Sequence, residues 1–214
     1  MKHLLRAIGL AVLGFIVVFA QQNADPDRIM KGGGGLPAGW MARLDSGSTK
    51  PDGVNIMQMG GGLHFITGPT GIFYRPADKK SGPYEVHATF TQVAPSGHRE
   101  AYGLFIGGSN LDGPSQKYSY FLIGQDGVFL VKRRAGPATP TVTDWTSNAA
   151  VKKTEGSTQG KNTLSIAVAL DKVRFLVNGT EVASAAPSQI DTSGIAGLRI
   201  NHNLNVMVSD FAFK

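Results

Sequence analysis

The chain has 214 residues, of which 17% are charged, with a formal charge of +6 and no cysteine. Without cysteine it has no disulfide bonds, no thiolate metal site and no thiol nucleophile, so its stability has to come from a packed core. The 42% of hydrophobic residues excludes a disordered chain, and 28 glycines with 11 prolines favour many tight turns over long helices.

The first 20 residues have the pattern of a secretory signal peptide. Lys2 and Arg6 make a basic start, and an uncharged segment, residues 7–20, ends in a small residue before polar sequence. These fourteen uncharged residues are fewer than the roughly 20 that span a bilayer. We therefore expect cleavage after Ala20 and a secreted or periplasmic protein, with membrane attachment only if the segment is retained.

The rest of the chain divides into a leader and one domain. Residues 21–39 are rich in Gln, Asn, Asp, Pro and Gly, which predicts a flexible Gly-rich leader. No linker follows Trp40, so residues 40–214 are expected to form a single domain. Removal of Lys2 and Arg6 lowers the formal charge from +6 to +4. The remaining basic residues are scattered, which does not favour nucleic-acid binding.

Hydrophobic residues in this domain mostly alternate with polar or small ones, which is typical of strands. The predicted strands and hairpins cover 54–59, 63–67, 71–75, 84–93, 101–107, 118–134, 164–170, 173–182, 195–201 and 204–213. No segment after residue 20 has a helical period. About a dozen closely spaced strands joined by Gly, Asp and Asn turns predict an all-β fold, a two-sheet antiparallel sandwich or jelly roll.

The segment 173–182 is the strongest local signal. Asn178-Gly179 is the preferred pair for a two-residue type I′ hairpin turn, because both positions need positive φ. The turn predicts the cross-strand pairs Val177 with Thr180, Phe175 with Val182, and Leu176 with Glu181. The expected core residues of this region are Leu164, Ile166, Val168, Phe175 and Val177.

A second hairpin is predicted over 118–134, where Gly124-Gln125-Asp126-Gly127 separates two runs of β-forming residues. If the loop between the two runs has an even number of residues, Tyr118, Tyr120 and Arg133 lie on the same face of the hairpin. Both faces of the hairpin are largely apolar, so we expect it to lie in the centre of a sheet and to be covered on both sides.

With these strands in place, the C-terminal half resembles a concanavalin A-like, laminin G-like jelly roll. The residues that carry the resemblance are Trp145, Asn162 to Val168, Val173 to Gly179, Gly194 to Leu198, and Ser209 to Phe211. The chain is similar to the family 16 glycoside hydrolase-like domain of bacterial exported proteins, also called the 3-keto-disaccharide hydrolase domain. This resemblance implies the fold and says little about chemistry.

Catalytic residues are hard to find in the sequence. Retaining glycosidases need two carboxylates about 5–5.5 Å apart, and the resemblance implies a Glu-x-Asp-x-x-Glu strand motif that this chain does not contain. Glu85 and His87 are the one acid and base expected on a common strand face, and they are weak catalytic candidates; an exposed polar face is the simpler interpretation.

Sugar binding needs flat aromatic surfaces and a few fixed hydrogen-bonding groups. Tyr102, Tyr118, Tyr120 and Arg133 are the predicted binding patch, with core tyrosines as the competing interpretation. Asn110 and Asp112 lie in a polar loop, 109–115, of the kind that commonly carries specificity.

No metal or cofactor follows from the sequence. The histidines at 64, 87, 98 and 202 have no short metal-ligand spacing. The resemblance implies a structural calcium in some proteins of this fold, but no Asp-rich loop places one here. The sequence therefore predicts an exported, non-catalytic carbohydrate-recognition domain whose partner is a glycan or polysaccharide. The alternatives are a glycoside or keto-sugar hydrolase or lyase of the family 16-like group, and a structural or protein-interaction module of the cell surface.

Overall fold

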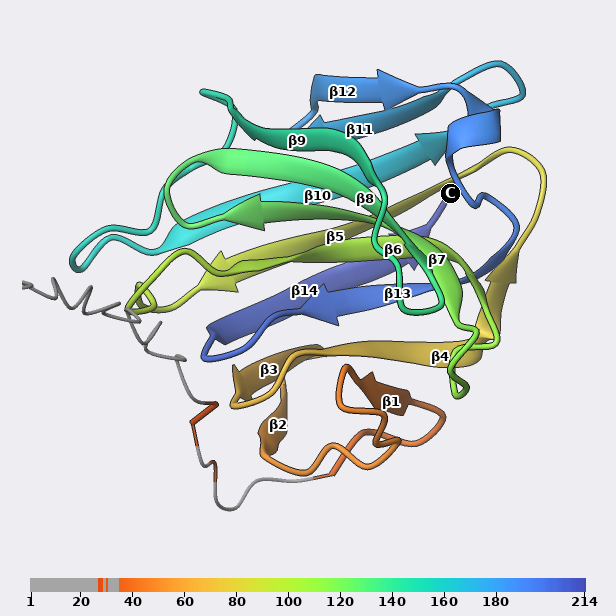
Figure 1. Ribbon diagram of the computed structural model, residues 1–214. Helices are drawn as coiled ribbons and strands as arrows, with labels where there is room; N and C mark the ends of the chain where they lie inside the picture. The colour runs from red at the N-terminus through yellow and green to blue at the C-terminus, as the bar shows by residue number, and fades with distance from the viewer. Residues whose placement is uncertain (1–26, 29, 31–34) are drawn as a thin grey trace, which may run out of the picture.

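A computed structural model describes residues 27–28, 30 and 35–214; the predicted signal peptide lies outside this part of the chain. Two seven-stranded antiparallel sheets form the domain (Figure 1). Sheet 1 has the order β1(Met41–Leu44), β4(Gly71–Lys80), β13(Gly194–Ile200), β6(Ala101–Ser109), β7(Lys117–Gly124), β8(Val128–Ala135), β9(Thr141–Ser147). Sheet 2 has the order β12(Thr180–Ala185), β11(Val173–Val177), β10(Gly160–Val168), β5(Tyr84–Gln92), β14(Asn205–Phe213), β3(Gly62–Thr67), β2(Val54–Met59).

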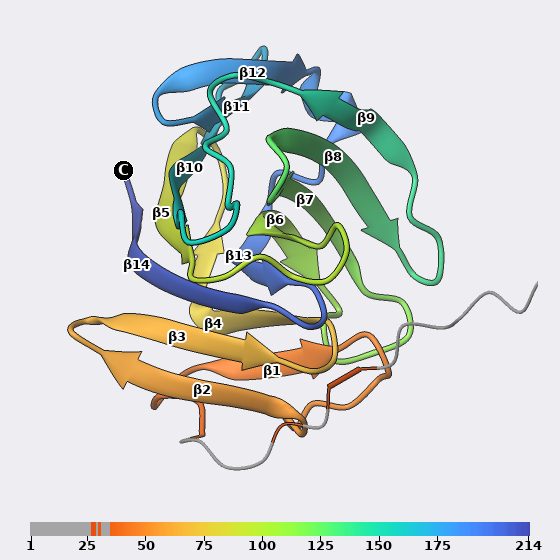
Figure 2. The ribbon, with the colours of Figure 1, turned by 90° about the vertical axis from the view of Figure 1, so that its left-hand side faces the viewer.

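The two sheets pack face to face, with β5 and β10 in one layer and β7 and β8 in the other (Figure 2). The only helical element among the described residues is the 3-10 turn η1(Pro187–Gln189). None of the described helical elements is long and apolar enough to cross a membrane. The all-β sandwich predicted from strand periodicity is confirmed.

The main core lies between the sheets, and the predicted core residues are all in it. Leu164, Ile166, Phe175 and Val177 are almost fully buried, and Val168 is buried as well. The ring of Phe175 in sheet 2 contacts that of Phe121 in sheet 1 at 5.4 Å between centroids, so the two layers meet through aromatic side chains. Leu170 follows the end of β10 and is 85% exposed, since the chain already turns there.

The β11–β12 hairpin has the predicted turn. Asn178 and Gly179 have φ values of 51° and 82°, as a type I′ turn requires. Val177 pairs with Thr180 and Leu176 with Glu181, as predicted. The third pair is wrong: Phe175 lies opposite Ala183, because a β-bulge adds Val182 as an extra residue in β12.

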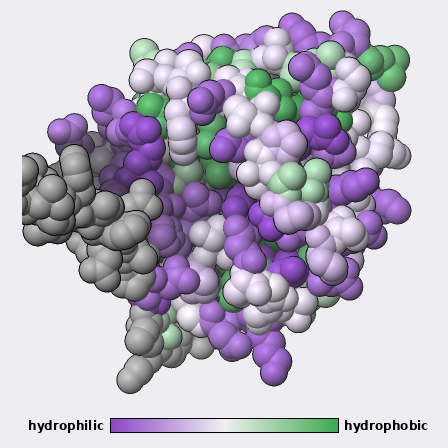
Figure 3. Space-filling view, in the orientation of Figure 1, coloured by the Kyte–Doolittle hydropathy of each residue, from purple (hydrophilic) through white to green (hydrophobic). Residues whose placement is uncertain are grey.

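A second apolar cluster covers the outer face of sheet 1. It contains Tyr74, Phe105, Tyr118, Leu122 and Leu130, all buried, and Leu111 from the β6–β7 loop joins it. The β7–β8 hairpin therefore lies inside the sheet, between β6 and β9, and is largely buried on both faces, as predicted, although the second half of β8 is only half-buried. On the side of the molecule shown in Figure 3, hydrophobic residues are scattered among hydrophilic ones and do not form one continuous patch.

Candidate functional site

The predicted tyrosine and arginine patch does not form, because the register of the β7–β8 hairpin differs by one residue from the expected one. Tyr118 pairs with Arg134 and Tyr120 with Lys132, whereas Arg133 pairs with Ser119 on the opposite face. The loop has three residues, 125–127, and Gly127 at its end has φ of 87°. A type I turn followed by a glycine bulge has this form, and an odd loop length moves every side chain of one strand to the other face.

Arg133 has a structural contact instead. Its Nε and Nη2 atoms each donate a hydrogen bond of 3.0 Å to the carboxylate of Asp191, in the segment that leads into β13. These hydrogen bonds and the charge of Asp191 raise the pKa of Arg133, although burial acts to lower it. The guanidinium therefore anchors a loop.

The tyrosines are buried. Tyr118 and Tyr120 are 0% and 6% exposed on the outer face of sheet 1, and Arg199 donates a 2.8 Å hydrogen bond to the Tyr118 hydroxyl. Tyr102 faces the core between the sheets and contacts Phe90 at 5.6 Å between ring centroids. Burial raises the pKa of all three phenols. The competing interpretation, core tyrosines, describes them correctly.

The other predicted site residues are exposed or half-buried. Asn110 has φ of 51° and lines a hollow with Lys80 and Ile195, whereas Asp112 lies two residues further along the same loop. Glu85 lies on the outer face of sheet 2 and accepts a 3.0 Å hydrogen bond from the Lys214 ammonium. His87 shares that face, since Val86 between them points into the core. The predicted functional roles of these four residues remain predictions.

A pocket of about 280 Å³ is lined by residues of the β2–β3 hairpin, β4 and the end of β14. These strands lie near one another in Figure 2. Core residues Leu198 and Val208 contribute to its lining. The groups that can bind a ligand come from four segments of the chain: Trp40, Gln58, Met59, Arg75, Asp210 and Phe211. This volume is close to the roughly 300 Å³ at which small-molecule sites begin. It therefore suits a single ring-sized group.

Aromatic rings and a guanidinium line this pocket. The Arg75 Cζ atom lies 5.4 Å from the ring centroid of Trp40 and 5.5 Å from that of Phe211, within the range of cation–π contacts. The two rings are 5.8 Å apart and tilted by 49°. Asp78 accepts a 2.6 Å hydrogen bond from Arg75 Nε, which holds the guanidinium in place. Together these side chains form a pre-arranged aromatic and cationic wall.

A β-bulge in β14 turns Phe211 toward this wall. Ser209 pairs with Thr89 of β5 and Ala212 with His87, so β14 contains one extra residue between them. Asp210 in this bulge has φ of 56°. Since alternate residues of a strand face opposite sides, Phe211 would point away from the face of Val208 without the bulge. The bulge puts Phe211 on the core-facing side, next to Trp40.

Sequence reasoning did not find this pocket. Trp40 was noted as the start of the domain, but nothing in the spacing of residues 40, 75 and 211 shows that they meet. The Gly60-Gly61 pair at the tip of the β2–β3 hairpin, with φ of 55° and 85°, is a local signal for the turn that presents Met59. A bulge has no comparable sequence signature here.

Comparison with known proteins supports the fold. No family model matches the chain, and no curated protein sequence matches it significantly. Among solved structures, the carbohydrate-binding module CBM66 from Bacillus subtilis is similar with a TM-score of 0.58 and 12% identity, over 82% of this chain and 95% of that one. A β-glucanase from Bacillus licheniformis gives 0.54 and 12% over 86% and 97%, and the alginate lyase A1-II′ gives 0.52 and 10% over 82% and 92%.

These neighbours and the two seven-stranded sheets define the chain as a concanavalin A-like jelly-roll sandwich. The resemblance seen in the C-terminal strands is thus confirmed at the level of the fold. Sequence identities of 10–12% support similarity of the fold only, so the function has to be argued from the site.

Proposed function

We propose that this domain is an exported carbohydrate-binding module without catalytic activity, and that the pocket beside Trp40 receives one sugar residue of a glycan. The observation that carries the proposal is the wall of Trp40, Phe211 and Arg75. Aromatic rings bind the apolar faces of sugars, and a fixed guanidinium donates hydrogen bonds to hydroxyl or carboxylate groups.

The polar groups of the pocket fit the same ligand class. Asp210 offers carboxylate oxygens and Gln58 an amide, so donors and acceptors surround the aromatic wall. Asp210 is the one carboxylate among the described residues that line the pocket. A retaining or inverting glycosidase needs a pair, which favours binding over hydrolysis at this position. The names of the similar structures, a carbohydrate-binding module among them, agree with the ligand class.

The experiment is a glycan array with the mature protein, followed by calorimetry with the best ligand and a hydrolysis screen on the same preparation. The chain contains a matched control, since its second tryptophan, Trp145, is also contacted by an arginine, with Arg99 Cζ 5.4 Å from its ring. We expect Trp40→Ala to weaken binding about 10- to 100-fold, and Trp145→Ala to leave it unchanged. Equal effects of both variants, or no glycan bound by a folded protein, would contradict the proposal. Released sugar would establish the hydrolase or lyase alternative.

A further inference from the structure

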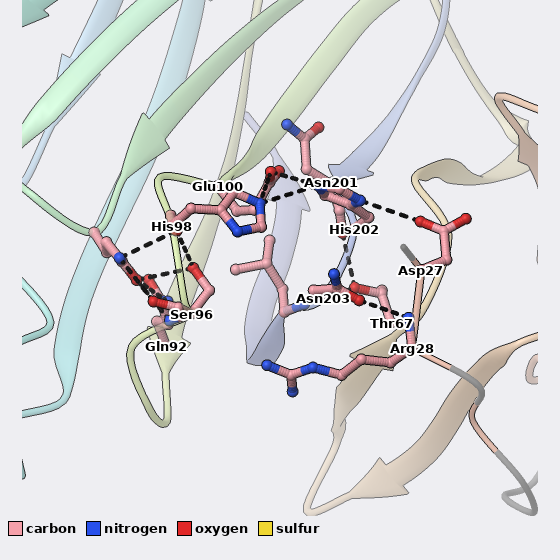
Figure 4. Close-up of polar contacts among 12 residues, drawn as sticks. Asp27, Arg28, Thr67, Gln92, Ser96, His98, Glu100, Asn201, His202 and Asn203 are labelled. Atoms are coloured by element: carbon pink, nitrogen blue, oxygen red, sulfur yellow. Dashed lines mark hydrogen bonds and ion pairs between the residues drawn. The ribbon is translucent and has the colours of Figure 1, made fainter. Parts of the chain in front are cut away.

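A cluster of two histidines and a glutamate lies at one end of sheet 1, away from the pocket beside Trp40. His98 and Glu100 immediately precede β6, and His202 lies in the turn between β13 and β14. Since β6 and β13 are antiparallel neighbours, with Tyr102 opposite Ile200, the start of one strand meets the end of the other. Sheet pairing thus joins residues that are far apart in the sequence (Figure 4).

Three side-chain atoms converge in this cluster. Glu100 Oε1 lies 2.8 Å from His98 Nε2 and 2.6 Å from His202 Nε2, and the two nitrogen atoms are 3.2 Å apart. The circle through these three atoms has a radius of about 1.7 Å, shorter than the roughly 2.0–2.1 Å bonds that zinc forms with His nitrogen and carboxylate oxygen. One ion can therefore contact all three atoms from just outside their plane, with small adjustments of the side chains.

We propose that His98, Glu100 and His202 form a binding site for a divalent transition-metal ion, with zinc as the best fit. Imidazole nitrogen suits zinc and its neighbours in the first transition row, whereas calcium and magnesium prefer sites made of oxygen atoms alone. Three protein ligands leave a fourth tetrahedral position for water or another molecule.

Residues around the cluster hold the ligands in place. Asp27 Oδ1 lies 3.1 Å from His202 Nδ1, so His202 can donate its second ring hydrogen to a carboxylate, the usual partner of a metal-binding histidine. The backbone amide of Arg28 donates to Asn203 Oδ1 at 2.8 Å, which fixes the segment that carries Asp27 (Figure 4).

The loop of His98 is fixed in the same way. Ser96 Oγ donates a 2.6 Å hydrogen bond to the His98 carbonyl, and Gln125 Oε1 accepts one of 2.7 Å from the Ser96 amide. Gln125 comes from the β7–β8 loop, so a fourth segment of the chain supports the site. Metal sites typically have such hydrogen bonds, which fix the position of the ligands from the residues around them.

The electrostatics of the cluster favour a cation. Glu100 and Asp27 place two carboxylates against the imidazole of His202. A dication bound to neutral imidazoles would be balanced by the same two carboxylates. Glu100 is itself only 8% exposed, so its charge is little screened by water.

The test is calorimetry with zinc on untagged mature protein freed of metal by a chelator, with cobalt absorption spectra to report coordination. We expect one zinc ion per chain and a rise of the melting temperature with zinc. His98→Ala and His202→Ala should lower the affinity by at least 100-fold, and Asp27→Asn by about 10- to 100-fold. The matched controls are His64→Ala and His87→Ala, which remove histidines outside the cluster.

Melting temperatures without metal show which variants fold; His98 is exposed, so its variant is the safer one. Failure of the wild type to bind one equivalent, or an equal loss in the His64 control, would overturn the proposal and leave a hydrogen-bonded network only. Glycan binding measured with and without chelator separates this site from the pocket beside Trp40, since each proposal can fail alone.

Discussion

Arg199 and Asp45 form a two-point ion pair on the outer face of sheet 1. Arg199 Nη1 donates to Asp45 Oδ1 at 3.1 Å, and Nη2 donates to Oδ2 at 2.9 Å. Arg199 lies on β13 and Asp45 just after β1, so the pair spans the intervening strand β4. The Arg199 side chain is only 9% exposed, and its Nη1 atom also donates to the Tyr118 hydroxyl. This pair allows a charged group to lie among the buried tyrosines.

Asp45→Asn is expected to lower the free energy of unfolding by about 3 kcal/mol, because it leaves the buried guanidinium of Arg199 without its counter-charge. Urea denaturation measures the change. The control is Asp126→Asn, which breaks the Arg99–Asp126 pair, whose side chains are 47% and 38% exposed. That change should cost less than about 1 kcal/mol. Equal costs for the two variants would show that burial does not decide the strength of the pair.

The same pair predicts a loss of stability in acid. Burial alone would raise the pKa of Asp45, but the charge and hydrogen bonds of Arg199, together with the charges of Arg134 and Arg43, outweigh it and hold the pKa below its usual value of 3.8. A carboxyl group with a lowered pKa in the folded state stabilises it at pH values above the unfolded pKa. That contribution disappears as the pH falls through the folded pKa.

The measurement is the free energy of unfolding of the wild type and of Asp45→Asn at a series of pH values. Their difference should be constant from about pH 5 to pH 8 and should shrink below about pH 4. A difference that stays constant into the acid range would mean that Asp45 does not titrate with a lowered pKa.

The turn at Asn178-Gly179 allows a test of backbone conformation alone. A Cβ atom at Gly179 would have nothing within 4 Å, so Gly179→Ala adds no clash and only forces alanine to adopt φ of 82°. We expect a cost of about 1–2 kcal/mol, since L-residues other than glycine are strained in the left-handed region. Gly97 has equally open surroundings without a positive φ. Gly97→Ala should therefore stay within about 1 kcal/mol of the wild type in thermal unfolding.

Phe175 tests the core between the sheets. It is 1% exposed, and Phe175→Ala should cost about 3–5 kcal/mol, because the cavity left between the sheets cannot close fully. Leu170→Ala is the control, since Leu170 is 85% exposed, and it should change stability by no more than about 0.5 kcal/mol. A small cost for Phe175→Ala would mean that the two sheets can close around the missing ring.

How far the sequence predicted the structure depends on how local each signal is. Asn178-Gly179 specifies its turn by itself, so the φ values and the two pairs nearest the turn were correct. The 124–127 loop admits several lengths, and the one-residue difference put Arg133 on the wrong face. Side-chain alternation indicated the longer strands that bury one or both faces, but it missed the short β1 and the largely exposed β9. It also does not reveal bulges such as those at Val182 and Asp210.

The two candidate sites lie beyond sequence reasoning for a different reason. His98 and His202 meet only because β6 pairs with β13, and Trp40, Arg75 and Phe211 meet only because the sheets close on each other. Histidine spacing along the chain therefore gave no metal site. A single sequence contains no information on such long-range pairing until the strand order is known.

The bulge in β14 gives the last prediction, which concerns the pocket without any ligand. Phe211→Ala would remove the ring that the bulge places beside Trp40, 5.8 Å away between ring centroids. In a Trp145→Phe background Trp40 is the one remaining tryptophan, and its fluorescence reports on the pocket directly. We expect acrylamide to quench Trp40 more strongly after this substitution. Asp210→Gly keeps the bulge and relieves the positive φ of 56°, so it should leave quenching unchanged and stabilise the fold by about 1 kcal/mol. Unchanged quenching in a folded Phe211→Ala variant would show that Phe211 does not shield Trp40, and the pocket would then need another explanation.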